Sequence, residues 1–117
     1  MPEQAVAKSL SLAIKRSGNT AVVHCHGRLV AGVTGYFYRE VSPLIPDRKR
    51  IALDFAELSH MDSSGIGTLV RLYVSAKSGG CTLQLMNVGK PVRCLLGITH
   101  LMSLLQIIGE NNIRMGP

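Results

Sequence analysis

Hydrophobic and polar residues alternate near the start of the chain. Every second residue from Leu10 to Ile14 is a large aliphatic one, which is the period of a half-buried β-strand. Residues 17–20, Ser-Gly-Asn-Thr, carry a turn signal, and a second β-prone run follows from Ala21 to His26. The pattern predicts an antiparallel hairpin whose second strand ends at Gly27.

The spacing of the apolar residues then changes to that of a helix. Within residues 31–45, Val33, Phe37 and Val41 recur at helical intervals, although the two glycines in this segment each cost a helix ~1 kcal/mol. We predict a helix that begins late in the segment and closes near the prolines at 43 and 46.

The middle of the chain predicts two strands joined by a longer helix. The largely apolar run from Ile51 to Phe55 is typical of a central strand that is buried on both faces. From Gly65 onward, apolar residues follow one helical face as far as residue 77, and Gly79-Gly80 supplies a stop. Residues 81–86 predict the second strand, and the helix is long enough for a parallel crossover between the two strands.

Shorter elements are expected toward the end of the chain. Apolar residues at 92, 95 and 96 follow Pro91 and indicate a short helix, and those at 101, 104 and 105 indicate another. Ile107-Ile108 suggests a last short strand. We expect one domain over residues 8–108, with loose termini at 1–7 and 109–117.

Strands that alternate with helices after an initial hairpin indicate the α/β class. We predict a mixed sheet of four to five strands with helices mainly on one face. The chain of 117 residues is long enough for one hydrophobic core, and no linker or internal repeat divides it.

The composition predicts a cytoplasmic protein without metal or cofactor. No apolar run reaches the ~18 residues of a membrane helix, and the first residues lack the pattern of a secretory signal. The three cysteines form no Cys-x-x-Cys pair, so we interpret them as reduced and largely buried. His24 and His26 share a strand face but supply only two metal ligands.

The chain is basic, with 13 Lys and Arg against 7 Asp and Glu and a formal net charge of +6. Arg48-Lys49-Arg50 is the only tight cluster. The few aromatic residues are not interleaved with the cations, so the pattern does not predict a surface on which the bases of a single-stranded nucleic acid could stack. We expect no direct nucleic-acid binding, and an acidic protein partner accounts for the charge equally well.

A polar turn, Asp62-Ser63-Ser64-Gly65, lies where the buried strand gives way to the long helix. Asp62 suits an N-cap, which accepts hydrogen bonds from the amides that follow it. Ser63 would then lie beside a helix N-terminus, whose free N–H groups favour anions such as a phosphate. The residues alone leave two interpretations open, a plain capping turn and a serine switched by phosphorylation.

Four segments of the chain together resemble the STAS domain, and more closely the bacterial anti-sigma factor antagonists. They are residues 53–55, 58–67, 79–83 and 97–101, and the second contains the Asp-Ser-Ser-Gly core. The resemblance extends from about residue 8 to about residue 108. It implies a single STAS-like domain of four to five strands with flanking helices, and no enzymatic activity.

The resemblance also implies a partner switch. In that family the serine after the aspartate is phosphorylated by a cognate anti-sigma factor that is itself a serine kinase. The unphosphorylated form binds the anti-sigma factor and releases the sigma factor, and a serine phosphatase resets the switch. Carried over, Ser63 is the phosphorylation site, and Asp62, Ser64 and Gly65 form its turn. The implied partner surface comprises Gly27, Arg28, Leu29, Val30, His60, Met61, Ile66, Gly67 and Val70.

Three positions depart from the usual family pattern. Val30 stands where relatives usually carry an aspartate near the phosphorylation site, His60 replaces a large apolar or aromatic residue, and His100 replaces a common glycine. The basic charge also contrasts with acidic members of the family. These departures keep an alternative open, a non-switching STAS module that serves as a scaffold subunit of a stress-signalling complex or an accessory subunit of a membrane transporter.

The residues give little support to two alternatives, a serine hydrolase and a nucleotide-binding site. The serines lack the Gly-x-Ser-x-Gly elbow of a hydrolase, and Asp62 is too close to Ser63 to act as the distant acid of a triad. Residues 65–67, Gly-Ile-Gly, are only a fragment of a nucleotide-binding glycine motif, with no lysine at P-loop spacing. The oligomeric state stays open.

Overall fold

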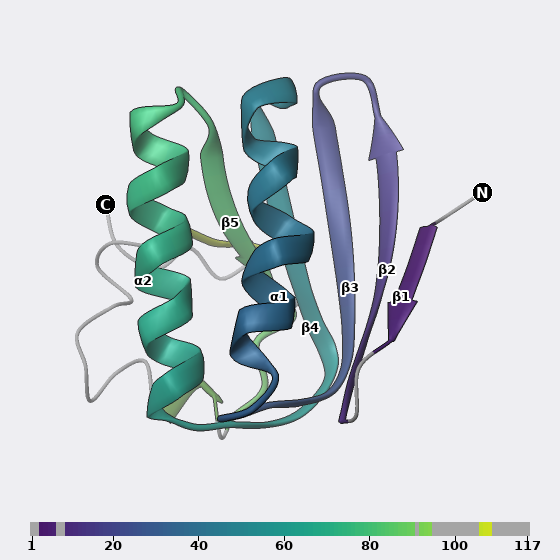
Figure 1. Ribbon diagram of the computed structural model, residues 1–117, viewed down its shortest axis with the longest axis vertical. Helices are drawn as coiled ribbons and strands as arrows, with labels where there is room; N and C mark the ends of the chain where they lie inside the picture. The colour runs from purple at the N-terminus through teal and green to yellow at the C-terminus, as the bar shows by residue number, and fades with distance from the viewer. Residues whose placement is uncertain (1–2, 7–8, 91, 95–105, 109–117) are drawn as a thin grey trace.

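The computed structural model describes residues 3–6, 9–90, 92–94 and 106–108. Within these residues a single six-stranded sheet carries two α-helices on one face (Figure 1). The α/β class and the mixed sheet, both predicted, are confirmed. The elements in chain order are β1 (Glu3–Val6), β2 (Leu10–Ser17), β3 (Thr20–Leu29), α1 (Thr34–Val41), the 3-10 helix η1 (Ser42–Asp47), β4 (Arg50–Met61), α2 (Ser63–Ser78), β5 (Thr82–Met86) and β6 (Gln106–Ile108).

The strands lie in the sheet in the same order as in the chain. The pairs β1–β2 and β2–β3 are antiparallel, whereas β3–β4, β4–β5 and β5–β6 are parallel. The predicted hairpin and the predicted parallel relation between the strands that flank α2 are therefore confirmed. Strands β3 and β4 consequently end at the same edge of the sheet, where α2 begins.

Three strands depart from the expected bounds. We expected residues 1–7 to be loose, but Glu3–Val6 pairs with Ser11–Ile14 of β2, which corrects that expectation for these residues and raises the strand number to six. Strand β3 does not end at Gly27 but continues to Leu29 across a register shift. Gly27 has a φ of +112°, and a Cβ there would collide with the Ser9 carbonyl oxygen, so the strand passes this point only with glycine.

Strand β4 is also longer than the apolar run that predicted it. It extends past Phe55 to Met61, because Glu57 and His60 pair with His26 and Arg28 of β3. Glu57 and His60 are exposed, so the apolar pattern could not reveal this half of the strand. The extension carries the chain to the edge of the sheet directly before Asp62.

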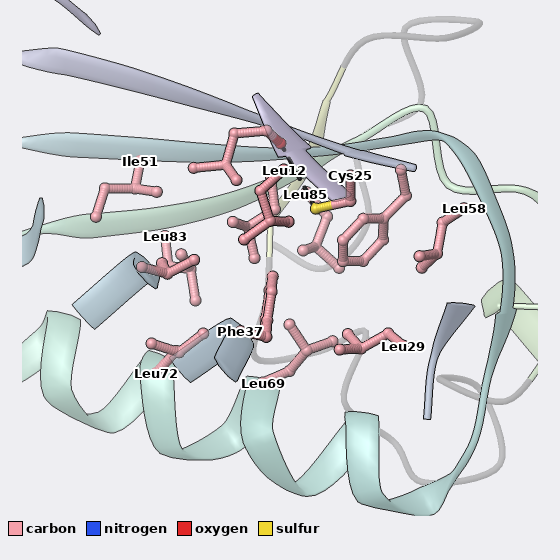
Figure 2. Packing of buried hydrophobic residues seen from close by; sticks show 14 of the residues in the cluster. Leu12, Cys25, Leu29, Phe37, Ile51, Leu58, Leu69, Leu72, Leu83 and Leu85 are labelled. Atoms are coloured by element: carbon pink, nitrogen blue, oxygen red, sulfur yellow. Dashed lines mark hydrogen bonds between the residues drawn. The ribbon is translucent and has the colours of Figure 1, made fainter. Parts of the chain in front are cut away.

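The hydrophobic core fills the space between the sheet and the two helices (Figure 2). Phe37 of α1 and Leu69 and Leu72 of α2 are fully buried against it. The sheet contributes Leu12, Cys25, Leu29, Ile51, Leu58, Leu83 and Leu85 among others. This packing holds the helical layer at a fixed position over the strand ends.

The helices confirm most of the predicted pattern. The segment 31–45 does contain a helix that begins late, at Thr34, but it continues after Val41 as η1 because a proline fits the first turn of a helix. Helix α2 ends at Gly79, whose amide donates to Ser75 O and Ala76 O. Residues 92–94 are helical and β6 is present as predicted, whereas the expected helix at 101–105 lies outside the described residues.

Candidate functional site

The candidate site lies at the edge of the sheet where β3 and β4 end side by side. Leu29 and Met61 are paired in register at these ends, and the amide of Asp62 donates to the Leu29 carbonyl oxygen at 3.3 Å. Helix α2 begins at the next residue, Ser63. The fold therefore brings together the two segments that the sequence singled out, around residues 27–30 and 60–70.

Asp62 is the N-cap of α2, as predicted. Its Oδ1 accepts hydrogen bonds from the amides of Ser64 at 2.9 Å and Gly65 at 3.1 Å. Its Oδ2 accepts a third bond, 3.0 Å long, from the amide of Ala31 in the loop after β3. This third bond fixes the loop to the start of the helix, and nothing in the sequence pointed to it.

These hydrogen bonds lower the pKa of the Asp62 carboxyl group. The bond from the Ala31 amide has the largest effect, and the bonds from Gly65 and Ser64 add to it, while partial burial works in the opposite direction. The carboxylate is therefore charged at neutral pH, beside the hydroxyl group of the next residue.

Ser63 is the first residue of α2 and is exposed. In the part of the chain that the structure describes, its hydroxyl group has no hydrogen-bond partner. Ser64 is half-buried, and its carbonyl oxygen accepts a bond of 2.9 Å from the Thr68 hydroxyl. Of the two neighbouring serines, Ser63 is thus the more accessible one.

Gly65 allows the helix to approach the strand ends closely. A Cβ at this position would lie 2.7 Å from Met61 Cγ and 2.8 Å from the Leu29 carbonyl oxygen, both too short for a real contact. At Gly67, one half-turn further, a Cβ would meet nothing within 4 Å. Gly65 is required by packing, whereas Gly67 leaves a bare patch of helix surface beside Ser63.

The predicted partner residues divide by exposure. Arg28, His60 and Gly67 are exposed, while Gly27, Val30, Met61 and Val70 are half-buried. Leu29 and Ile66 are buried in the core, so their side chains shape the surface from below and do not present themselves to a partner. This corrects the expectation that both contribute to the contact surface.

The exposed ends of β3 and β4 carry a short polar chain. Arg28 and His60 are opposite each other in register. His60 Nδ1 lies 3.1 Å from Ser59 Oγ, and the Ser59 hydroxyl donates to the Gly27 carbonyl oxygen at 3.0 Å. These bonds hold the two strand ends together next to the turn that carries Ser63.

Val30, where the family resemblance led us to expect an aspartate, begins the loop after β3. Val30 is half-buried and packs against the core, and its carbonyl oxygen accepts from the Val33 amide at 3.1 Å. Among the described residues, Asp62 supplies the carboxylate that is bonded to this loop, through Ala31. The surface beside Ser63 is accordingly apolar at Val30.

A second polar cluster, which the sequence did not reveal, lies among β3, β4 and the end of β5. His24 Nδ1 is 2.7 Å from Asp54 Oδ2, and Asp54 Oδ1 accepts from Asn87 Nδ2 and the Ala56 amide, each at 3.0 Å. Burial tends to raise the pKa of Asp54, but the bonds from Asn87, Ala56 and His24 outweigh it and lower this pKa. The cluster ties three strands together.

No three His, Cys, Asp or Glu side chains come together as a metal site within the ranges that the structure describes. No helix in those ranges is long and apolar enough to cross a membrane. Cys25 and Cys81 are buried free thiols, as expected for two of the cysteines, while Cys94 is exposed.

Comparison with known proteins gives the same fold. The sequence matches the STAS domain family over residues 11–113. The anti-sigma factor antagonist SpoIIAA, in its unphosphorylated form, is 21% identical and superposes with a TM-score of 0.73 over 86% of this chain and 90% of its own. The phosphorylated form of the Bacillus protein superposes with a TM-score of 0.68 at 20% identity, over 86% of this chain and 93% of its own.

Two further solved structures span the range of relatives. An anti-sigma factor antagonist from Mycobacterium paratuberculosis is 14% identical, with a TM-score of 0.76 over 85% of each chain. A sulfate transporter family protein from Wolinella succinogenes is 18% identical, with a TM-score of 0.67 over 78% of this chain and 75% of its own. The likeness to these structures is one of fold, and the match over residues 11–113 shows that the chain belongs to the STAS domain family.

Proposed function

We propose that this protein is a cytoplasmic anti-sigma factor antagonist that changes partners when Ser63 is phosphorylated. The unphosphorylated form binds an anti-sigma factor that is a serine kinase, and the bound anti-sigma factor releases its sigma factor. A phosphate on Ser63 ends this contact, and a serine phosphatase restores it. The observation that carries the proposal is the exposed hydroxyl of Ser63 at the first position of α2, which has no hydrogen-bond partner among the described residues.

The fold itself tolerates a phosphate at this position. The free N–H groups and the dipole at the start of α2 favour an anion. The phosphate would add roughly −1.5 to −2 charges next to the Asp62 carboxylate, which is already ionised. Its main effect is therefore expected at the partner surface and not inside the domain.

One phosphate is enough to switch a protein contact off. Two like charges about 4 Å apart at an effective dielectric constant near 20 repel by about 4 kcal/mol. Since about 1.4 kcal/mol corresponds to a tenfold change in affinity, this repulsion amounts to roughly three decades. An acidic group of the partner facing Ser63 would supply the second charge.

The surface around Ser63 suits such a contact. Arg28, His60 and the bare helix at Gly67 are exposed beside it, and Val30 adds a partly apolar patch. SpoIIAA, which shares the fold, exists in both an unphosphorylated and a phosphorylated form, and this supports the assignment of a modifiable serine to the family member described here.

The site assignment is tested by phosphorylation with the cognate kinase and ATP, followed by mass spectrometric mapping. We expect one phosphate on wild-type protein, located at Ser63, and none on the Ser63→Ala variant. The Ser64→Ala variant is the matched control and should be phosphorylated like the wild type. Modification of Ser64 alone would contradict the assignment.

A second candidate function is a non-switching STAS module, either an accessory subunit of a transporter or a scaffold subunit of a stress-signalling complex. The similarity in fold to a sulfate transporter family protein favours the transporter form of this alternative. A pull-down of the tagged protein from its native lysate separates the two functions. Recovery of a serine kinase supports the switch, and recovery of a transporter in the membrane fraction supports the alternative.

A further inference from the structure

The positive charge of the chain is concentrated at the end of the domain opposite Ser63. We define this basic end as residues 15–20, 42–50 and 71–82, which are the β2–β3 turn, η1 with the following loop, and the second half of α2 with the start of β5. Seven of the 13 Lys and Arg residues lie in it, but only one of the 7 acidic residues, Asp47. The rest of the chain then holds six basic and six acidic residues, so the entire net charge of +6 arises at the basic end.

Backbone hydrogen bonds hold the three segments of the basic end together. The amides of Lys49 and Arg50 donate to the Asn19 carbonyl oxygen at 2.8 and 3.1 Å, and the Thr82 amide donates to the Lys49 carbonyl oxygen at 2.8 Å. In Figure 1 the β2–β3 turn and the C-terminal end of α2 lie at the top, while the start of α2 lies at the bottom. The exposed cations of the basic end therefore form one surface.

An open groove of about 760 Å³ adjoins this surface, between α1 with η1 on one side and α2 on the other. Ile45, Pro46 and Val74 provide its apolar lining, and Val74 is 55% exposed, the one large hydrophobic side chain that stands exposed among the described residues. Seven of its eight lining residues, all but Tyr38, lie within residues 42–50 and 71–82, so the groove opens in the basic end itself.

The guanidinium group of Arg71 stacks on Tyr38, one of the residues that line the groove. Arg71 Cζ is 4.2 Å from the centre of the Tyr38 ring, and the Tyr38 hydroxyl lies 3.2 Å from Ser75 Oγ. Stacking on the ring holds this cation against a residue of the groove lining. The groove thus combines an apolar lining with an oriented positive charge, and further exposed cations flank it.

We propose that the groove and the basic end together form a second docking surface, which binds an acidic segment of a partner protein and receives one of its apolar side chains against Val74. Charge complementarity selects an acidic ligand, and the apolar lining selects a polypeptide among acidic ligands. A single-stranded nucleic acid would stack its bases on exposed aromatic faces, but Tyr38 is half-buried under Arg71. A membrane would require a broad exposed apolar patch, which a concave groove with a single exposed Val74 does not provide.

The second surface works independently of Ser63. Helix α2 has 16 residues. Val74 follows Ser63 by eleven residues in this helix, which corresponds to about 16 Å along the axis, about twice the screening length of about 8 Å at physiological salt. A phosphate on Ser63 would therefore leave binding at the basic end unchanged. The inference does not rest on the proposed function, and the distance leaves room for two partners at once.

Fluorescence anisotropy tests this surface with the full chain. The probe is a short fluorescein-labelled peptide of glutamates with two leucines, titrated at low and at physiological salt. We expect saturable binding that weakens by about tenfold in the Lys49→Glu/Arg50→Glu double variant, because both side chains are exposed and each exposed ion pair contributes only a little. Val74→Asp, at an exposed position, should also weaken binding several-fold.

Two variants serve as controls. Lys90→Glu reverses an exposed charge outside the basic end, and Ser63→Asp adds a charge at the other end of the domain. Each should change the affinity less than about twofold, because charges beyond the screening length are largely shielded.

Several results would overturn the proposal. A Lys90→Glu effect equal to that of the double variant would mean unspecific attraction to the net charge. Equal binding of a peptide in which serines replace the leucines would remove the role of the groove. Single-stranded DNA or phosphatidylserine vesicles are the competing ligands. If either bound more tightly than the peptide, and the same variants abolished that binding, the surface would be assigned to a nucleic acid or a membrane. Absence of saturable binding would exclude an acidic segment. Circular dichroism and a thermal melt of each variant ensure that a loss of binding is not a loss of the fold.

Discussion

Asp62 joins two parts of the site that lie far apart in the sequence. One carboxylate oxygen caps the start of α2, and the other accepts from the Ala31 amide in the loop after β3. The cap followed from the residue type and its place before a helical pattern. The bond to Ala31 could not be predicted, because it depends on the parallel register that brings Leu29 next to Met61.

We expect the Asp62→Ala substitution to lower the free energy of unfolding by about 2 kcal/mol, since an N-cap alone is worth about 1–2 kcal/mol and the bond to Ala31 is lost as well. Urea unfolding followed by circular dichroism measures this. Asp47→Ala is the matched control, because it removes the same charge from an exposed side chain and should cost less than about 0.5 kcal/mol. Equal losses in the two variants would contradict the role given to Asp62.

The lowered pKa of Asp62 also predicts a pH dependence of stability. The folded-state pKa lies below the value of about 3.9 in the unfolded chain, so the unfolded state binds more protons as the pH falls through this window. The contribution of Asp62 is complete above about pH 4 and is lost as the pH falls through the folded-state pKa. Urea midpoints measured from about pH 5 to pH 2 should decline less steeply in Asp62→Ala than in the wild type, and parallel curves would refute the assignment.

At the level of the element, the start of α2 contains two glycines in different surroundings. Gly65 packs closely against the strand ends, whereas Gly67 faces open space. We expect Gly65→Ala to destabilise the domain by about 1–3 kcal/mol, because its methyl group would overlap Met61 and the Leu29 carbonyl oxygen. Gly67→Ala should stabilise the domain by up to about 1 kcal/mol, because alanine suits a helix and the space there is open. Chemical denaturation of both variants checks the pair, and effects of the same sign would contradict this account of the helix start.

The elements show where sequence patterns were sufficient and where they were not. Helix α2 and the inward-facing residues of β2 follow their periodicities closely. The outer half of β4 escaped prediction because its residues pair with β3 on a polar, exposed surface. Strand β1 escaped because four residues, Glu3–Val6, are too few to show an alternation. The bounds of both strands are determined by pairing with a neighbouring strand. A local sequence pattern carries no information about that pairing.

The same limit applied to the site. The Asp-Ser-Ser-Gly turn and its place before a helix were visible in the sequence, and the structure adds that Ser63 is exposed while Ser64 is half-buried. Leu29 and Ile66 were expected at the partner surface but belong to the core. Proximity to Ser63 along the chain could not distinguish a residue that faces a partner from one that faces the core.

At the scale of the whole molecule, the domain has two ends of different character. Ser63 lies at the end where β3 and β4 finish, and the net positive charge lies at the other (Figure 1). The core between them is continuous, so each end is held on the same rigid body. We therefore propose that one end carries the switch and that the other is free for a constant partner.

A negative charge at Ser63 should act on the partner and spare the fold. We expect Ser63→Asp to change the free energy of unfolding by less than about 1 kcal/mol, because the helix N-terminus favours the new carboxylate while the neighbouring Asp62 opposes it. A thermal melt of this variant beside Ser63→Ala measures the effect. A large loss of stability in Ser63→Asp alone would show that the charge disrupts the turn itself.

The central claim is that charge at Ser63 controls binding to an anti-sigma factor kinase. Isothermal titration calorimetry of that partner with wild type, Ser63→Ala and Ser63→Asp tests it most directly. We expect Ser63→Ala to bind like the unphosphorylated wild type. Ser63→Asp should bind at least about a hundredfold more weakly, since an aspartate carries less charge than the phosphate, whose repulsion is worth roughly three decades of affinity. Equal affinities of all three proteins would contradict it.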